Sequence, residues 1–187
     1  MTKADTPLIS SIKSLQSSPA DMRRILEELS QVLRADKSWS RAEIFRAGEI
    51  LFDRKKASPV KDLWHSPPTM MTTTLDDAIG QGLQIIHLFG RLAGVDVKPL
   101  GLMQSPEDII SSCRQQMPDI LGLTILQFHS EETLCEIIAN LPSHIQVIVG
   151  GPIFRSMGLE KLDAKDYLVL KDIKHFIDYL LTYNDSR

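Results

Sequence analysis

The chain lacks the features that would place it in a membrane or on nucleic acid. Its 187 residues contain no apolar run approaching the ~18 residues of a membrane span, and the N-terminal stretch is polar, so we expect no signal peptide. The longest basic block is Arg54-Lys55-Lys56 and the formal net charge is -3, which argues against a phosphate-backbone partner. We therefore expect a cytoplasmic protein that binds neither membranes nor nucleic acid directly.

Cysteine is scarce, and the common catalytic motifs are missing. Cys113 and Cys135 lie in helix-like patterns without C-x-x-C spacing, so the sequence indicates neither a thiolate metal site nor a disulfide framework. There is no G-x-S-x-G motif, no Cys/His pairing and no Walker-type glycine-rich loop with lysine. The acidic pair Asp76 and Asp77 therefore has no nucleophile to assist, and it is also well placed to cap a helix. The sequence predicts no catalytic residue.

Apolar residues make up 43% of the chain, which is enough to bury one good core. The N-terminal part has helical spacing. We predict helices over 8–15, from the start signal Ser18-Pro19-Ala20-Asp21 to about residue 33, and from Ser40 to about Lys55. Such short helices cannot cover their own apolar faces, so they pack either on the rest of the chain or on a second copy in a homodimer. Prolines then bracket a connector, and we predict a helical segment over 1–65 and a second domain over 66–187.

The second part alternates strand-like and helix-like patterns. Strands are predicted at 69–74, 95–100, 119–126, 144–149 and 167–170. A helical pattern follows each of these strands except the fourth. This alternation predicts an α/β fold, a doubly wound, Rossmann-like or flavodoxin-like, five-stranded parallel sheet preceded by a small N-terminal helical segment.

Polar and glycine residues gather where the predicted strands end. They are Asp76, Asp77, Gly80 and Gly82 after the first strand, Thr124, Leu126 and His129 around the end of the third, and Gly150 and Gly151 after the fourth. Ligands of parallel α/β sheets bind at the carboxyl ends of the strands, and glycine allows close approach of the backbone. Although Gly150-Gly151-Pro152 is also consistent with a simple tight turn, we favour ligand access, and His129 is a possible ligand contact or a solvated loop residue.

These stretches resemble the cobalamin-binding domain of methionine synthases, corrinoid methyl carriers and carbon-skeleton mutases. That family has Asp-x-His-x-x-Gly after the first strand, Ser-x-Leu in the third and Gly-Gly after the fourth. The matching stretches here are 75–80, reading L-D-D-A-I-G, Thr124-Ile125-Leu126, and Gly150-Gly151. The resemblance covers about 69–180 and implies a cobalamin cofactor, with its nucleotide tail in a slot lined by the matched residues.

The position of the cobalt ligand departs from the family pattern. In the family the histidine binds cobalt from below and the aspartate orients it, whereas this sequence has Asp77 and Leu75 at those positions. A carboxylate is a harder, charged donor than imidazole. The resemblance therefore implies a corrinoid bound without a protein histidine, and leaves the metal ligand unknown.

Two readings of function stay open. The first is a non-catalytic corrinoid-binding protein in a sensing, cofactor-handling or carrier role, whose partner is a methyltransferase subunit or a regulator. The second is a regulatory or protein-interaction module on the same fold that binds heme or no cofactor, since the resemblance includes antirepressors with related domains.

Overall fold

The computed structural model describes residues 6–14, 21–35, 39–57, 60–76, 81–127, 130–152, 154 and 167–183. The chain forms two compact units. The first comprises Met1–Pro67, Ile85–Val95 and Ile173–Arg187, and the second comprises Pro68–Gln84 and Asp96–Asp172. In the described part of the chain, no helix has the length and apolar character needed to cross a bilayer. The predicted domain boundary at residues 65 and 66 stays a prediction.

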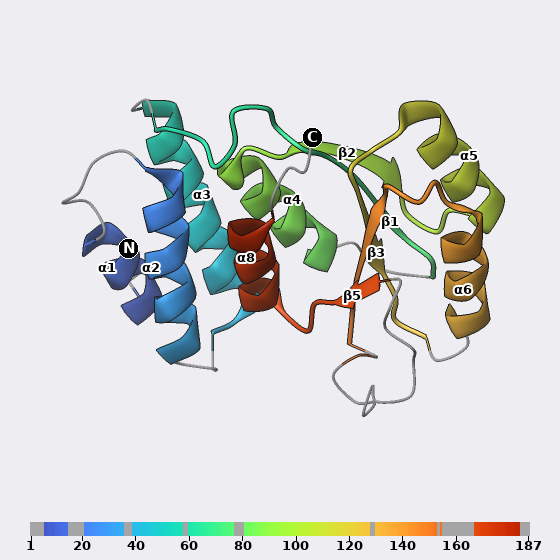
Figure 1. Cartoon of the computed structure of the whole chain (residues 1–187). Coiled ribbons are helices and arrows are strands. Elements are labelled where there is room, and N and C mark those ends of the chain that lie inside the picture. The colour runs from blue at the N-terminus through green and yellow to red at the C-terminus, as the bar shows by residue number, and fades with distance from the viewer. Residues whose placement is uncertain are drawn as a thin grey trace. The chain divides into compact units, whose positions relative to one another are not determined.

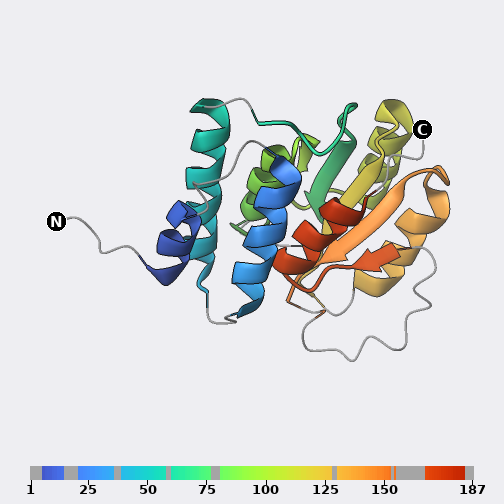
Figure 2. The same cartoon turned by 60° about the vertical axis from the view of Figure 1, so that its left-hand side comes forward.

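The first unit is helical (Figures 1 and 2). It contains α1 (Pro7–Ser14), α2 (Met22–Ala35), α3 (Arg41–Ala57), α8 (Ile173–Thr182) and residues 85–93 of α4 (Gln81–Ala93). Helix α2 buries Met22, Leu26, Leu29 and Leu33, the face that its spacing predicts. This helix packs against α8, and α1 packs against α3. The N-terminal helices thus find apolar partners within their own chain, while a homodimer stays a prediction.

The start of α2 differs from the prediction. The helix begins at Met22, and the Asp21 carboxylate accepts a hydrogen bond from the Arg23 backbone N–H at 3.0 Å. The Asp21 carbonyl accepts the first helical bond, from the Ile25 N–H. Asp21 is therefore the N-cap, a role that aspartate fills as well as serine. The predicted cap Ser18 lies outside the described residues.

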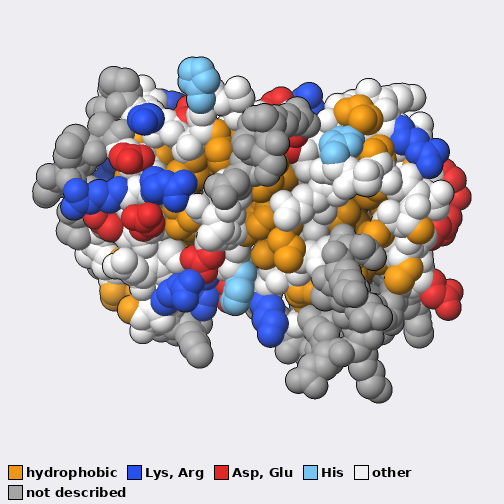
Figure 3. Space-filling view, viewed as in Figure 1, with side chains coloured by type: hydrophobic (Ala, Val, Ile, Leu, Met, Phe, Trp, Pro, Cys, Tyr) orange, Lys and Arg blue, Asp and Glu red, His pale blue; other side chains and the backbone are white. Residues whose placement is uncertain are grey.

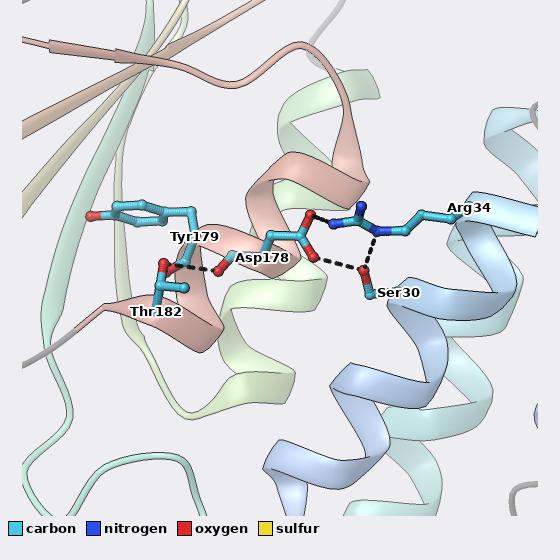
Figure 4. A network of polar contacts seen from close by, with 5 residues as sticks. All are labelled: Ser30, Arg34, Asp178, Tyr179 and Thr182. Carbon is cyan, nitrogen blue, oxygen red and sulfur yellow. Dashed lines mark hydrogen bonds and ion pairs between the residues drawn. The ribbon is translucent and has the colours of Figure 1, made fainter.

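A polar network joins α2 to α8 inside the first unit (Figure 4). The Ser30 hydroxyl donates to the Asp178 carboxylate at 2.7 Å, and the Arg34 guanidinium pairs with the same carboxylate. Ser30 is buried, so its bond is protected from water, whereas the Arg34 side chain is exposed and its ion pair contributes little. On the face shown in Figure 3, basic and acidic side chains alternate over the described N-terminal helices.

The second unit is built on a parallel sheet of β1 (Thr69–Thr74), β2 (Asp96–Gly101), β3 (Ile120–Thr124), β4 (Gln146–Gly150) and β5 (Tyr167–Val169). The strand order is β2-β1-β3-β4-β5, and every described pairing is parallel. The predicted five-stranded α/β fold is thus confirmed. Because the order reverses between β1 and β3, the connections after these strands leave the sheet in opposite directions. That point is where such sheets bind ligands.

Helices α5 (Pro106–Gln116) and α6 (Glu131–Asn140) pack side by side in this unit (Figure 1). Helix α5 begins after the N-cap Ser105, whose hydroxyl accepts from the Asp108 N–H, and Pro106 occupies the first turn. Apolar side chains of both helices and of the central strands form one buried core. Its members include Met71, Ile109, Cys113, Leu121, Leu123, Leu134, Ile137, Val147 and Val149. This core fixes the strands whose carboxyl ends carry the candidate site.

The two thiols differ sharply in environment, which gives a direct test of the core. Cys113 is buried, and desolvation raises its pKa to about 11, whereas Cys135 is exposed. Because the thiolate is the reactive form, we expect Ellman's reagent at about pH 8 to modify Cys135 quickly and Cys113 only after denaturation. Cys135→Ser should leave no reactive thiol in the folded protein. Fast modification of both thiols in the native wild type would contradict this packing.

Candidate functional site

The backbones of β1, β3 and β4 meet at one edge of the sheet, where these strands end. Thr74 of β1 lies beside Thr124 of β3, and the Leu75 N–H donates to the Thr124 carbonyl at 3.2 Å. On the other side, the Ile125 N–H donates to the Gly150 carbonyl at 2.9 Å. The residues that follow the first, third and fourth predicted strands are therefore neighbours in space, as the sequence led us to expect.

Asp76 ties the end of β1 to the segment that follows β3. Its Oδ2 accepts hydrogen bonds from two consecutive backbone N–H groups, those of Leu126 and Gln127, each at 2.8 Å. The Ser130 hydroxyl approaches the same oxygen at 3.3 Å. Charge-assisted bonds of this kind are stronger than neutral ones. They hold the two segments on either side of the point where the strand order reverses.

The second oxygen of Asp76 is not satisfied in the same way. The Asp76 residue is only 9% exposed, and its Oδ1 is buried with no hydrogen-bond partner among the residues that the structure describes. Buried polar atoms of folded proteins nearly always have a partner, because an unmet acceptor costs free energy. Within the described residues, this oxygen is an acceptor left open at the edge where a ligand is expected.

Thr74 fixes the connection between β2 and α5 to the same edge. Its hydroxyl accepts from the Met103 N–H at 2.9 Å, and its carbonyl accepts from the Gln104 N–H at 3.2 Å. Met103 has a left-handed backbone with φ of 54° and a 61% exposed side chain, and the preceding Leu102 is 44% exposed. Two apolar side chains thus stand at the edge of the sheet. No pattern in the sequence predicted these two side chains at the edge.

Close backbone contacts explain the glycines at the end of β4. Gly151 has φ of +138°, and a Cβ built there would lie 1.9 Å from the Ile125 carbonyl oxygen. A Cβ on Gly150 would lie 3.2 Å from the Leu170 carbonyl oxygen. The close backbone approach alone therefore requires glycine at 151, and ligand access through Gly150 and Gly151 stays a prediction. A Cβ on Gly82, which is exposed in the first turn of α4, would meet no atom within 4 Å.

The structure gathers part of the predicted site at this edge. Asp76, Thr124, Leu126, Gly150 and Gly151 lie there, and Gln127 and Ser130, which were not among the predicted site residues, join them. Their signal was the polar segment that follows the apolar third strand. The predicted residues Asp77, Gly80 and His129 lie outside the described residues.

The described part of this edge offers a corrinoid a partial fit. No group of three or more His, Cys, Asp or Glu side chains is placed to hold a metal ion among the described residues. The one described histidine of the second unit, His144, is exposed just before β4, at the opposite edge of the sheet. The open Asp76 oxygen suits a corrinoid, whose periphery carries amide N–H donors. The described residues of this edge therefore offer one acceptor for the amides of such a cofactor and no imidazole for its metal.

Comparison with known proteins identifies the family. The model of the B12 binding domain matches residues 68–174, more than half of the chain. A search of curated proteins finds no match.

Three solved structures resemble the chain. The first, a cobalamin-binding protein from Desulfitobacterium hafniense DCB-2, has 16% sequence identity and a TM-score of 0.62, with 84% of this chain and 80% of that chain covered. The second is the monomethylamine corrinoid protein of Methanosarcina barkeri, with 14% identity, a TM-score of 0.55, and 91% and 87% covered. The third is the methanol:cobalamin methyltransferase complex MtaBC of the same organism, with 14% identity, a TM-score of 0.54, and 97% and 87% covered.

At these identities the three structures show a shared fold, which agrees with the parallel sheet and its strand order. None of the descriptions names heme, so the heme alternative has no support. The matched segment contains all five strands and the edge organised by Asp76. The chain belongs to the B12-binding domain family.

Proposed function

We propose that this protein binds a corrinoid at the edge where β1 and β3 end, and presents it to a methyltransferase partner without catalysing the transfer itself. The observation that carries the proposal is the B12 binding domain match over the segment that contains this edge. The half-satisfied Asp76 carboxylate supports it, because it gives the edge an acceptor that the described residues do not use. When bound, the corrinoid supplies a cobalt centre that can carry a methyl group.

The cobalt is proposed to have no histidine ligand from the family's motif position. Asp77 stands where the family has histidine, and Leu75 stands where the family has the aspartate that orients it. Leu75 is half-buried and packs against the apolar core, so it has taken a structural role instead. The described residues of the α/β unit offer no imidazole at this edge. The protein's contribution is then to bind and orient the cofactor rather than to ligate its metal.

A role beside a methyltransferase is favoured over that of a free-standing sensor. The similarity to the monomethylamine corrinoid protein and to the MtaBC complex extends over 91% and 97% of this chain, so it includes most of the N-terminal helical segment as well as the sheet. A chain that shares both parts with such proteins is suited to carry or handle a corrinoid for another subunit.

The first experiment is an absorption spectrum after incubation with hydroxocobalamin and desalting. We expect about one corrinoid per chain, with the visible bands of the form whose own benzimidazole remains on cobalt. The physical reason is that no motif histidine competes with the benzimidazole. Heme, offered in a parallel incubation, should be lost on desalting. Release of all corrinoid would contradict the proposed function.

A matched variant separates binding from ligation. Asp77→His places an imidazole at the position that carries it in the family, and we expect the spectrum to shift toward that of histidine-bound cobalt while the corrinoid is retained. A wild-type spectrum that already has the histidine-bound form would instead show that another residue supplies the ligand, and His129→Ala would be the variant to compare.

A further inference from the structure

The open oxygen of Asp76 points to a specific role in ligand recognition. We propose that Asp76 Oδ1 accepts a hydrogen bond from an N–H or O–H group of the bound corrinoid, and that Asp76 is therefore a specificity-determining residue of the site. This inference rests on the proposed function, since it assigns one contact within the same site. It concerns the position between the aspartate and histidine of the family motif, here 76 between Leu75 and Asp77.

The described hydrogen-bond donors to the Asp76 carboxylate all serve its Oδ2 oxygen. Leu126 N–H, Gln127 N–H and the Ser130 hydroxyl converge on Oδ2, which fixes the plane and direction of the carboxylate. Oδ1 is held in place by the same bonds, is buried, and receives no hydrogen bond from the part of the chain that the structure describes. Because these bonds already order the carboxylate, a hydrogen bond to Oδ1 costs less side-chain ordering than one to a mobile acceptor.

The position of Asp76 in the fold makes a ligand the natural source of the missing donor. It directly follows Leu75 at the end of β1, and its partners follow β3, so it spans the point where the strand order reverses. A metal ion is a poor candidate, because the described residues contain no group of three or more His, Cys, Asp or Glu side chains that could hold one. A neutral donor fits better, and a corrinoid offers two kinds, the amides around its ring and the hydroxyls of its nucleotide tail.

Asp76→Asn tests this contact with little disturbance of the fold. The amide oxygen of asparagine can still accept from Leu126 and Gln127, but its NH₂ group then replaces Oδ1 and turns a donor toward the ligand's donor. Hydroxocobalamin and cobinamide, which lacks the nucleotide tail, are titrated into the wild type, Asp76→Asn and the comparison variant Ser130→Ala, which loses one bond to Oδ2 but leaves Oδ1 unchanged. We expect Asp76→Asn to weaken binding about ten- to a hundredfold and Ser130→Ala less than about threefold, because its lost bond is the longest of the three.

The two ligands identify the donor. Equal weakening for hydroxocobalamin and cobinamide assigns it to a ring amide, whereas weakening for hydroxocobalamin alone assigns it to the tail, and both results support the inference. Melting curves of the ligand-free variants show whether each is folded during the titration. If Asp76→Asn does not fold, wild-type protein is titrated with cobalamins in which one peripheral amide is hydrolysed to a carboxylate, together with cobinamide, and loss of affinity in none of these would overturn the contact.

Other outcomes separate the inference from the proposed function. Failure of the wild type to bind either corrinoid would remove the function itself. Tight binding by the wild type with an unchanged affinity of Asp76→Asn would leave the function standing and overturn the inference. Equal losses in Asp76→Asn and Ser130→Ala would also overturn it, because they would show that the carboxylate acts only by positioning the segment after β3.

Discussion

Gly151→Ala is expected to lower the free energy of unfolding of the α/β unit by about 3–5 kcal/mol. The Cβ would lie 1.9 Å from the Ile125 carbonyl oxygen and 2.9 Å from its carbonyl carbon, and neither atom belongs to a flexible side chain that could move aside. The φ of +138° adds backbone strain for any residue with a Cβ. Urea denaturation followed by circular dichroism measures the change.

Gly82→Ala is the matched control for this substitution. A Cβ at position 82 meets no atom within 4 Å, and the residue lies in the first turn of α4. Alanine is the better helix former, so we expect no loss and a gain of up to about 1 kcal/mol. A Gly151→Ala protein as stable as the wild type would show that the ends of β3 and β4 are not held as close as the structure has them, and would weaken the case for a shaped edge.

Ile109→Ala is expected to cost about 3 kcal/mol, the second largest effect. Ile109 lies on α5, is fully buried and belongs to the core that includes Met71 of β1 and Leu121 of β3. Truncation removes buried apolar contacts and leaves a cavity beside the central strands. The midpoint of thermal unfolding should fall by about 6–12 °C for a chain of this size.

The neighbouring residue provides the comparison for Ile109. Ile110→Ala removes the same atoms from the same helix, but Ile110 is only partly buried at the margin of the core, so about 1 kcal/mol is expected. Corrinoid affinity of the folded Ile109→Ala protein should remain close to that of the wild type, since Ile109 is not among the residues at the edge. Equal costs for the two variants would contradict the placement of the core on the Ile109 face of α5.

The sequence by itself predicted the elements and the edge that carries the site. The apolar spacing along α2 and the apolar run of β3 are local patterns, and each is repeated in the structure because local periodicity decides which face of a helix or strand is buried. The alternation of strands and helices then predicted a parallel sheet with its ligand edge at the carboxyl ends. Motif residues gave the family before any contact was known.

Prediction was less accurate where a segment's partner lay far along the chain. The third strand was predicted to reach Leu126, but it ends at Thr124, because the Leu126 and Gln127 N–H groups bind Asp76 instead of a neighbouring strand. Asp76 and Leu126 are 50 residues apart, and Ser30 and Asp178 are 148 apart. No local pattern encodes such pairs.

What the sequence determined is therefore the architecture, the B12-binding family and the absence of histidine from the motif position. What only the tertiary structure decided is the use of particular groups: which oxygen of Asp76 is occupied and which is open, why Gly151 must be glycine, and which helix covers α2. The physical reason is that secondary structure follows from short-range spacing and backbone preference, whereas hydrogen-bond satisfaction and close packing depend on atoms that the fold brings together from distant parts of the chain.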